Sequence, residues 1–419
     1  MEPTDSTGQG RATPAFEELL NAYLLPLLFG ARISGAGRQE RGSLPPVSCH
    51  GPHRLRVATA EQGRDFFTIE RAVPFTEEER VFVERVIKRL FDESAQSGQG
   101  REPDFSRFNN AVEWAIAHRI SAEYAPTLHS IFQIYKEWSA PENRGSAHSA
   151  GVYFSRSTGP GGNFFSLRGE SCLKAMGASS DTLLALGRNG AILSVETIPP
   201  PPLDQRRIQH LAAPLAFADL ALWTSGRKAA VRLCPDGRIL VFFGKRLLFM
   251  RRDAYWRSYP HTLAGIDELL PADCPSVTVE VRRSVYLSCL DLAFAGQEAC
   301  IGILPDEKGA QDFFGGLGAT PLLTAGNLSG GAKLMAGLIK DKKFQDLPRS
   351  FRMEMAAMDG ALVMDGRGRI LSAGAGFGCR HTPDQSPGRE AAKSFSGCGL
   401  GVSVSSTGAI EIFGARLQP

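Results

Sequence analysis

The local sequence pattern changes in the middle of the chain, and this change constrains the fold more than any other feature. Before residue 139, apolar residues recur at helical spacing in segments such as Thr76–Glu93, which opens with a capping-box pattern. After residue 163, tight-turn residues join apolar runs, and both Asn189-Gly190 and Pro235-Asp236-Gly237 predict β-hairpins. Residues 139–163 are rich in Gly, Ser, Pro and Asn, so we expect them to connect the two kinds of structure.

The part of the chain before this change favours helices. Helices are expected over Phe16–Phe29, with a kink at Pro26, and over Phe108–Arg119 and Ala122–Trp138. Residues 1–15 are expected to form a disordered tail, and residues 33–55 a loop.

The last part of the chain combines short strands with helices. Strands are expected at Val277–Val281, Ala299–Leu304, Ala361–Met364, Ile370–Ala373, Leu400–Val404 and Ala409–Phe413, and helices at Tyr286–Phe294, Lys333–Ile339 and Ala391–Phe395. A mixed sheet covered by helices fits this order. The sequence therefore predicts an α/β (α+β) chain with a helical region over residues 16–150, a small α+β module over 151–270 and a mixed-sheet domain over 276–419.

Length, charge and cysteine usage exclude several classes of protein. A chain of 419 residues is expected to form two or three domains. Its net charge of +3 is small, so we expect neither a nucleic acid nor a membrane as partner. The apolar run Ala22–Phe29 is too short to span a bilayer. The 8 cysteines form no CxxC pair, so we expect reduced cysteines and a cytoplasmic protein.

Three segments of the last third resemble the diadenylate cyclase domain, which makes cyclic di-AMP from two ATP molecules. Tyr286–Leu304 is similar to the opening helix and first strand of that family, and Met358–Gly374 to its Asp-Gly-Ala signature and the hairpin after it. Ala391–Phe413 is similar to the next helix and the closing hairpin. The resemblance implies a domain that binds ATP with Mg²⁺ or Mn²⁺ as cofactor. It also implies that the N-terminal region acts as a sensor of an unidentified ligand.

The second signature of the family, Arg-His-Arg, is altered in this chain. Counted back from Ala391, the aligned residues are Gly388, Arg389 and Glu390, so an arginine replaces the histidine and both family arginines are lost. A Gly-Cys-Arg-His-Thr string at 378–382 lies too early by spacing, unless the residues after it are an insertion. In the final turn serines stand where the family usually has glutamate. Nucleotide binding is therefore better supported than full cyclase activity.

The resemblance assigns the central chemistry to Asp359. This carboxylate would lie beside the attacking 3′-hydroxyl and would ligate the metal, while Gly360 and Ala361 would let the nucleotide approach the backbone closely. An ordinary Asp-Gly turn before a strand is the alternative. The Arg389 guanidinium, just before the Ala391–Phe395 helix, is expected to bind phosphate, and a plain surface arginine is the alternative.

The resemblance extends the nucleotide site to further residues. The neighbours of Arg389, the closing turn and the strand aligned with the adenine pocket contribute Gly388, Glu390, Ser405, Ser406, Thr407, Ala299, Cys300 and Ile301. Ordinary turn chemistry explains the three turn residues equally well, and core packing is the more frequent role of the strand residues.

Three functions remain open from the sequence. The first is a metal-dependent diadenylate cyclase under control of the N-terminal sensor. Because each ATP must meet an ATP held by a facing protomer, this function implies a homodimer or a higher homo-oligomer. The second is a catalytically degenerate nucleotide-binding regulator of the same fold. The third is a structural protein in which the fold binds nothing.

Overall fold

A computed structural model shows a chain that forms two compact units. Unit 1 comprises Met1–Ile198, Gly226–Phe243 and Leu248–Tyr259, and unit 2 comprises Pro199–Ser225, Gly244–Leu247 and Pro260–Pro419. The structure describes residues 14–39, 44–60, 64–71, 73–96, 104–140, 149–155, 161–166, 181–200, 208–226, 228–259, 277–305, 308–309, 311, 313–314, 323, 330–339, 342–375 and 387–414. The predicted tail over residues 1–15 lies almost wholly outside these ranges.

Unit 1 contains a four-stranded antiparallel sheet near its N-terminus. Its strands are β1 (Arg32–Arg38), β2 (Val47–Cys49), β3 (Arg54–Ala58) and β4 (Asp65–Glu70), in the order β1-β4-β3-β2. The loop predicted for residues 33–55 is therefore wrong, and the region 16–150 is helical only in part. The prediction failed because β1 contains glycines, which composition alone assigns to loops. A Cβ at Gly37 would lie 2.7 Å from the Phe66 ring, so this strand needs glycine to pack.

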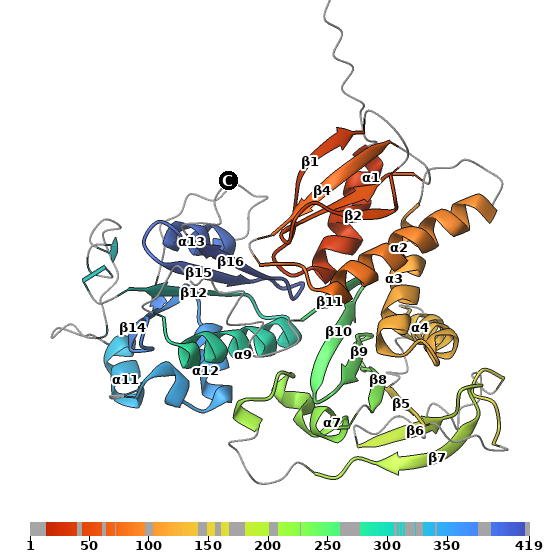
Figure 1. Cartoon of the computed structure of the whole chain (residues 1–419). Coiled ribbons are helices and arrows are strands. Elements are labelled where there is room, and N and C mark those ends of the chain that lie inside the picture. Colours follow the sequence, from red (N-terminus) through yellow and green to blue (C-terminus); the bar gives the residue numbers. More distant parts are fainter. Residues whose placement is uncertain are drawn as a thin grey trace, which may run out of the picture. The chain divides into compact units, whose positions relative to one another are not determined.

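The predicted helices of unit 1 are confirmed (Figure 1). They are α1 (Pro14–Leu19), which continues through a π-helical turn to a 3₁₀ turn at Leu25–Leu27, then α2 (Glu77–Gln96), α3 (Phe105–Ile120) and α4 (Ala125–Ser139). Pro26 lies in the 3₁₀ turn, where the regular helix has ended. The helix α3 begins earlier than predicted because the Asp104 carboxylate accepts a hydrogen bond from Arg107 N at 2.9 Å and caps it.

A seven-stranded mixed sheet completes unit 1, although the first two residues of one of its strands, Arg246 and Leu247, belong to unit 2. Its strands are β5 (Ala150–Phe154), β6 (Thr182–Leu186), β7 (Ile192–Thr197), β8 (Ala229–Leu233), β9 (Ile239–Phe243), β10 (Arg246–Arg252) and β11 (Tyr255–Ser258), in the order β11-β10-β9-β8-β5-β6-β7. Both predicted hairpins are confirmed, and Gly190 and Gly237 take positive φ values of 77° and 84°. One hydrophobic core contains Phe108 of α3, Phe132 of α4 and Trp256 of β11. Residues 16–150 and the strands after them therefore share a core.

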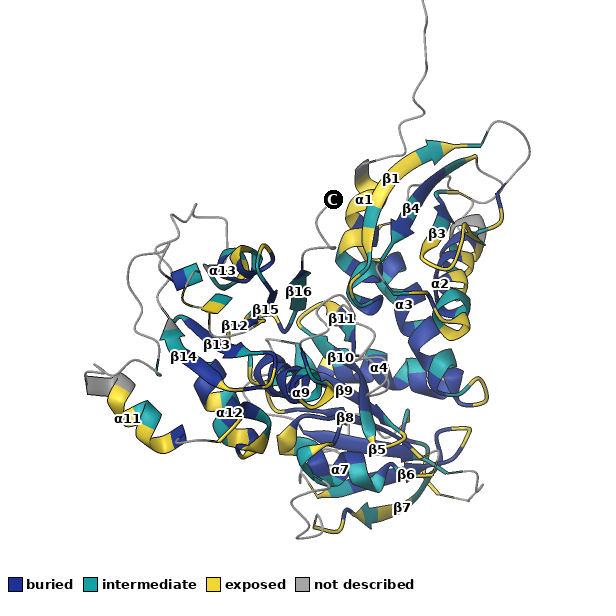
Figure 2. Cartoon of the chain, turned by 60° about the vertical axis from the view of Figure 1, so that its left-hand side comes forward, coloured by how far each residue is buried: buried dark blue, intermediate teal, exposed yellow. Residues whose placement is uncertain are grey.

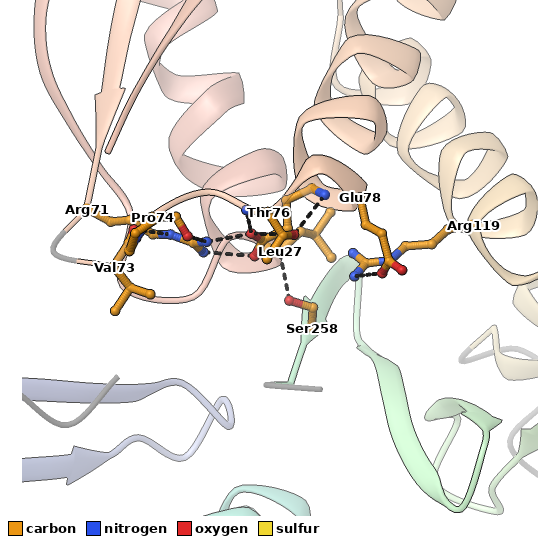
Figure 3. A network of polar contacts seen from close by, with 9 residues as sticks. Leu27, Arg71, Val73, Pro74, Thr76, Glu78, Arg119 and Ser258 are labelled. Atoms are coloured by element: carbon orange, nitrogen blue, oxygen red, sulfur yellow. Dashed lines mark hydrogen bonds and ion pairs between the residues drawn. The ribbon is translucent and has the colours of Figure 1, made fainter. Parts of the chain in front are cut away.

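The predicted capping box at the start of α2 is confirmed (Figure 3). Thr76 N donates to Glu79 Oε2 at 2.8 Å, and Glu79 N donates to Thr76 Oγ1 at 3.2 Å. The Arg71 side chain is 5% exposed, and its guanidinium binds both oxygens of the Glu79 carboxylate. It also donates to the carbonyl oxygens of Val73 and Pro74 at 3.0 and 2.8 Å. These bonds fix the loop between β4 and α2.

Removing the guanidinium by Arg71→Met is expected to destabilise unit 1. The Glu79 carboxylate is 12% exposed and would lose its cationic partner, at a cost of about 1–3 kcal/mol in unfolding free energy. Denaturant unfolding followed by circular dichroism measures this loss. Arg38→Met is the control, because Arg38 is 57% exposed and lies 3.7 Å from its carboxylate partner.

The same network predicts a pH dependence. Burial alone would raise the pKa of the Glu79 carboxyl, but the hydrogen bonds and charge of Arg71, with the bonds from Thr76, outweigh burial and lower that pKa. The stabilisation is therefore fully present above the unfolded-chain pKa of about 4.3 and is lost as pH falls through the lower folded pKa. The loss of unfolding free energy caused by Arg71→Met should accordingly become smaller at acidic pH. If the loss of unfolding free energy does not change with pH, the charged Glu79 carboxylate is not the group that Arg71 stabilises.

Unit 2 is built on a five-stranded mixed sheet covered by helices, as predicted (Figure 1). Its strands are β12 (Ala299–Leu304), β13 (Ala361–Asp365), β14 (Ile370–Ala375), β15 (Leu400–Val404) and β16 (Ile410–Gly414), in the order β14-β13-β12-β15-β16. Its helices are α7 (Ala218–Trp223), α9 (Val279–Ala295), α11 (Gly330–Ile339), α12 (Arg349–Ala356) and α13 (Pro387–Phe395). Helix α13 covers one face of the sheet, and α9 and α12 lie on the other. The predicted α+β fold class is confirmed.

One predicted strand of unit 2 is wrong. Residues Val277–Val281 alternate like a strand, but α9 begins at Val279. The Thr278 side chain accepts a hydrogen bond from Val281 N at 3.4 Å and caps the helix. A capping threonine among valines outweighs their strand propensity.

A buried ion pair holds unit 2 together. Arg349 of α12 and Asp291 of α9 are 1% and 3% exposed, and two hydrogen bonds of 2.6 and 3.0 Å join them. Arg349 also donates to the carbonyl oxygens of Leu211 and Ala213 at 2.8 and 2.7 Å. The Asp291 carboxylate accepts a bond from Leu215 N at 2.8 Å. This network draws residues 208–215, which the sequence assigned to the middle module, into unit 2.

Candidate functional site

The strand register brings the predicted site residues to one end of the five-stranded sheet. Strand β12 is parallel to β13, and Cys300 lies beside Ala361. Asp359 and Gly360 come directly before β13, so they lie where β12 begins. Both strands are buried from their first residues, as the dark strands of Figure 2 show.

The closing turn reaches the same end of the sheet. Strand β15 is antiparallel to β12, and Val404, its last residue, pairs with Ala299, the first residue of β12. The turn Ser405–Thr407 therefore follows at this end. The Ser405 and Thr407 hydroxyls bond each other at 2.9 Å, and Ser405 Oγ accepts from Ala409 N at 3.0 Å. These two hydroxyls thus do the ordinary work of holding the turn, and the exposed Ser406 lies between them.

Helix α13 brings Gly388, Arg389 and Glu390 to this end in its first turn. A Cβ at Gly388 would lie 3.6 Å from the carbonyl oxygen of Ala299 and 4.0 Å from Cys300 Cβ. The helix begins at Pro387, before the predicted Ala391, and proline has no backbone N–H, so the free N–H groups of its first turn belong to residues 388–390. Its N-terminus therefore sits over the start of β12.

Two glycines let the helix approach the sheet this closely. Gly302 of β12 and Gly401 of β15 are paired neighbours on the face under α13. A Cβ at Gly401 would lie 1.8 Å from the carbonyl oxygen of Ala392, and one at Gly302 would lie 2.5 Å from the Phe395 ring. Gly302 and Gly401 together form a flat surface without side chains, which we call the glycine platform. The packing of α13 against the glycine platform sets the position of the first turn of the helix.

The Asp359 side chain is exposed, and within the described residues nothing bonds its carboxylate. Gly360, with a φ of 96°, turns the chain directly after it. The Asp359 carbonyl oxygen lies 3.2 Å from the place a Cβ of Gly374 would take, so β13 and β14 meet tightly here. Asp359 thus offers its carboxylate to a ligand at this end of the sheet.

Arg389 has a partner that the sequence did not reveal. Its Nε and Nη2 donate to the two carboxylate oxygens of Glu411 on β16, at 2.8 and 3.1 Å. Its guanidinium carbon lies 5.8 Å from the centre of the Phe413 ring. The hydrogen bond that Arg389 donates to Glu411 raises the pKa of Arg389 more than partial burial lowers it. The predicted phosphate ligand is therefore held by a carboxylate.

The remaining predicted residues divide between surface and core. Glu390 accepts a bond from Lys393 Nζ at 2.6 Å, so its charge is balanced within α13. Ala299, Cys300 and Ile301 are 5%, 2% and 0% exposed, so their side chains belong to the core. Their carbonyl and amide groups serve the strand pairing. The strand therefore shapes the site through its backbone position.

The donor set fits a metal that the substrate itself helps to ligate. No group of three or more His, Cys, Asp or Glu side chains that could hold an ion occurs among the described residues. Asp359 is a carboxylate that could contribute, and Mg²⁺ is commonly bound by one or two carboxylates plus substrate phosphates. The Gly-Cys-Arg-His-Thr string at 378–382 lies outside the described residues.

Two further sequence predictions concern the cysteines and membrane-spanning segments. The cysteines that the structure describes, Cys49, Cys234, Cys289, Cys300 and Cys398, are all free. Across the described ranges, none of the helices combines the length and apolar character needed to cross a bilayer.

Comparison with known proteins gives little beyond the residues themselves. No family model and no curated protein matches the chain. Among solved structures, it is similar to a double mutant of DacA from Staphylococcus aureus, at 24% identity over 32% of this chain and 79% of that one, with a TM-score of 0.19. A TM-score this low adds nothing to the argument from the site.

Proposed function

We propose that unit 2 binds ATP at the end of the sheet where β12 and β13 begin, and that it joins two ATP molecules into cyclic di-AMP. One observation carries the proposal: the segments that resemble the cyclase family meet at this end. They are the start of β12, the Asp359-Gly360 turn, the first turn of α13 and the Ser405–Thr407 turn.

The residues have distinct roles in this reaction. The 3′-hydroxyl oxygen of one ATP forms a bond to the α-phosphorus of the other, and the bond to the β-phosphate breaks to release pyrophosphate. A second such step closes the ring. Asp359 accepts the hydroxyl proton or holds the hydroxyl in line. The first turn of α13 supplies N–H groups, and Arg389 supplies a cation, for the phosphates. A bound Mg²⁺ or Mn²⁺ would supply charge neutralisation on the triphosphate.

Two identical sites must face each other for this chemistry. Each protomer holds one ATP, so a two-fold dimer brings both hydroxyls to both α-phosphates. Unit 1 would then control the meeting of the two ATP-loaded protomers in response to an unidentified ligand.

The test is incubation of the full chain with ATP and Mn²⁺, with the products identified by mass spectrometry. Asp359→Asn is expected to reduce cyclic di-AMP formation by about 10²–10⁴-fold, because the amide cannot accept the proton. Asp346→Asn is the matched control. Asp346 is also exposed, but it lies at the opposite end of the strands, where Phe344 N donates to the carbonyl oxygen of Gly368 at 2.7 Å. Equal activity in both variants would sink the proposal.

A nucleotide-binding regulator without turnover is the second candidate. The ion pair between Arg389 and Glu411 favours it, because the one arginine of the altered signature is already bonded to a carboxylate. Saturable ATP binding with no cyclic product would select this candidate.

A further inference from the structure

Glu411 occupies the binding edge of the Arg389 guanidinium. The two N–H···O bonds of 2.8 and 3.1 Å are parallel, as in a fork-to-fork arginine–carboxylate pair. A phosphate group presents two oxygens with nearly the same spacing, so it competes for the same edge. Glu411 therefore stands where a phosphate of the nucleotide would bind.

The position of Glu411 in the sheet explains this contact. Glu411 pairs with Ser403 of β15, which in turn pairs with Cys300 of β12. The three side chains lie in one row on the face that α13 covers, because directly paired residues point to the same face. The first turn of α13 lies over this row, so a carboxylate at position 411 reaches residue 389.

The ion pair is weak enough to exchange. Its two side chains remain 45% and 40% exposed, and a surface pair of this kind contributes little to stability. A triphosphate carries several negative charges and also meets the N–H groups of the first turn of α13. It can therefore displace a single carboxylate from the guanidinium.

We propose that Glu411 is an internal competitor that limits the affinity of the site for nucleotide. This inference rests on the proposed function, since it concerns the same ligand at the same site. In the empty site Glu411 holds Arg389 in place. On binding, the phosphates take over the guanidinium and the Glu411 carboxylate returns to water.

The test measures the Kd of an ATP analogue whose α,β-bridging oxygen is replaced by methylene, so that it binds without reacting. Glu411→Gln keeps the shape and removes the charge, and it is expected to tighten binding by about fivefold, the upper range for an exposed ion pair. Glu298→Gln is the matched control. Glu298 is exposed and directly precedes β12 at the same end of the sheet, so this variant removes the same charge without freeing Arg389. It is expected to leave the Kd within about twofold.

A second pair of variants isolates the guanidinium. In an Arg389→Ala background, adding Glu411→Gln should leave the Kd unchanged, because the competitor has nothing left to compete for. If Glu411→Gln alone leaves the Kd unchanged or raises it, the inference is overturned. The inference is also overturned if Glu298→Gln lowers the Kd as much as Glu411→Gln does. Absence of binding in every variant overturns both this inference and ATP binding by unit 2. Binding with the expected pattern but without cyclic product removes the cyclase activity and leaves Glu411 as the competitor.

Discussion

Arg349→Ala is expected to lower the unfolding free energy by about 3–5 kcal/mol, because it leaves the Asp291 carboxylate charged and buried without its partner. Asp291 is 3% exposed, so bulk water solvates its carboxylate poorly and the guanidinium is its cationic partner. The carbonyl oxygens of Leu211 and Ala213 lose their donors in the same step. A loss of this size is a large share of the 5–15 kcal/mol that typically stabilises a folded protein.

Hydrogen exchange read by mass spectrometry localises this effect. Peptides from α9, α12 and residues 208–215 should lose protection in Arg349→Ala, because these are the segments that the guanidinium joins. Arg367→Ala is the control, since Arg367 is an exposed arginine of the same unit. Such surface substitutions usually change stability by no more than about 0.5 kcal/mol.

Arg349→Lys separates charge from geometry. Lysine keeps the positive charge but lacks the planar fork that bonds both Asp291 oxygens and four carbonyl groups. We expect it to recover only part of the lost stability. Full recovery would mean that charge alone matters and would contradict the network as described.

The segments that the sequence predicted well are those whose signals are local. The hairpin turn Asp365–Gly368 needs only its own residues: Asp365 Oδ1 accepts from Arg367 N and Arg369 N at 2.8 and 2.9 Å. The capping box of α2 likewise depends on residues three apart. Such turn and cap signals fix the element that contains them, whatever the rest of the chain does.

The segments that the sequence missed depend on distant partners. Strand β1 is recognisable only when Phe66 of β4 fills the space that Gly37 leaves. The bonds between Arg349 and residues 208–213 join positions more than 130 apart in the chain. No local pattern carries such information, so these residues were assigned to the wrong module.

The candidate site shows the same division. The Asp359-Gly360 turn and the closing turn were predicted to belong to the site from the resemblance of their local sequences to the cyclase family. The partner of Arg389 was missed, because Glu411 is one of many charged residues in alternating strands and its meeting with Arg389 depends on where α13 packs. That packing depends in turn on the glycines beneath the helix.

Gly401→Ala is therefore expected to disable the site without touching any residue that would contact nucleotide. The added methyl group would lie 1.8 Å from the Ala392 carbonyl oxygen and 2.5 Å from its carbonyl carbon. Both atoms belong to the backbone, so no side chain can rotate away, and the helix itself must shift. Overpacking of this kind costs about 1–3 kcal/mol in unfolding free energy.

The functional loss should exceed the loss in stability. The shift moves Gly388, Arg389 and Glu390 away from the start of β12, and a misplacement of about 1 Å can cost 10²-fold in rate. Cyclic di-AMP formation is expected to fall by about that factor, and peptides from α13 should exchange faster. Gly397→Ala is the control, because nothing lies within 4 Å of the added methyl group in the turn after α13.

The comparison of these two glycines tests whether helix position matters at all. Both substitutions add one methyl group to unit 2, and neither glycine has the positive φ that would strain an alanine. Gly401 lies in β15 and Gly397 in a turn, and the added methyl group meets backbone atoms only at Gly401. If hydrogen exchange in α13 and cyclic di-AMP formation were the same in Gly401→Ala as in the wild type, the glycine platform would not position the first turn of the helix. The placement of Arg389 at this end of the sheet would then lack its structural cause.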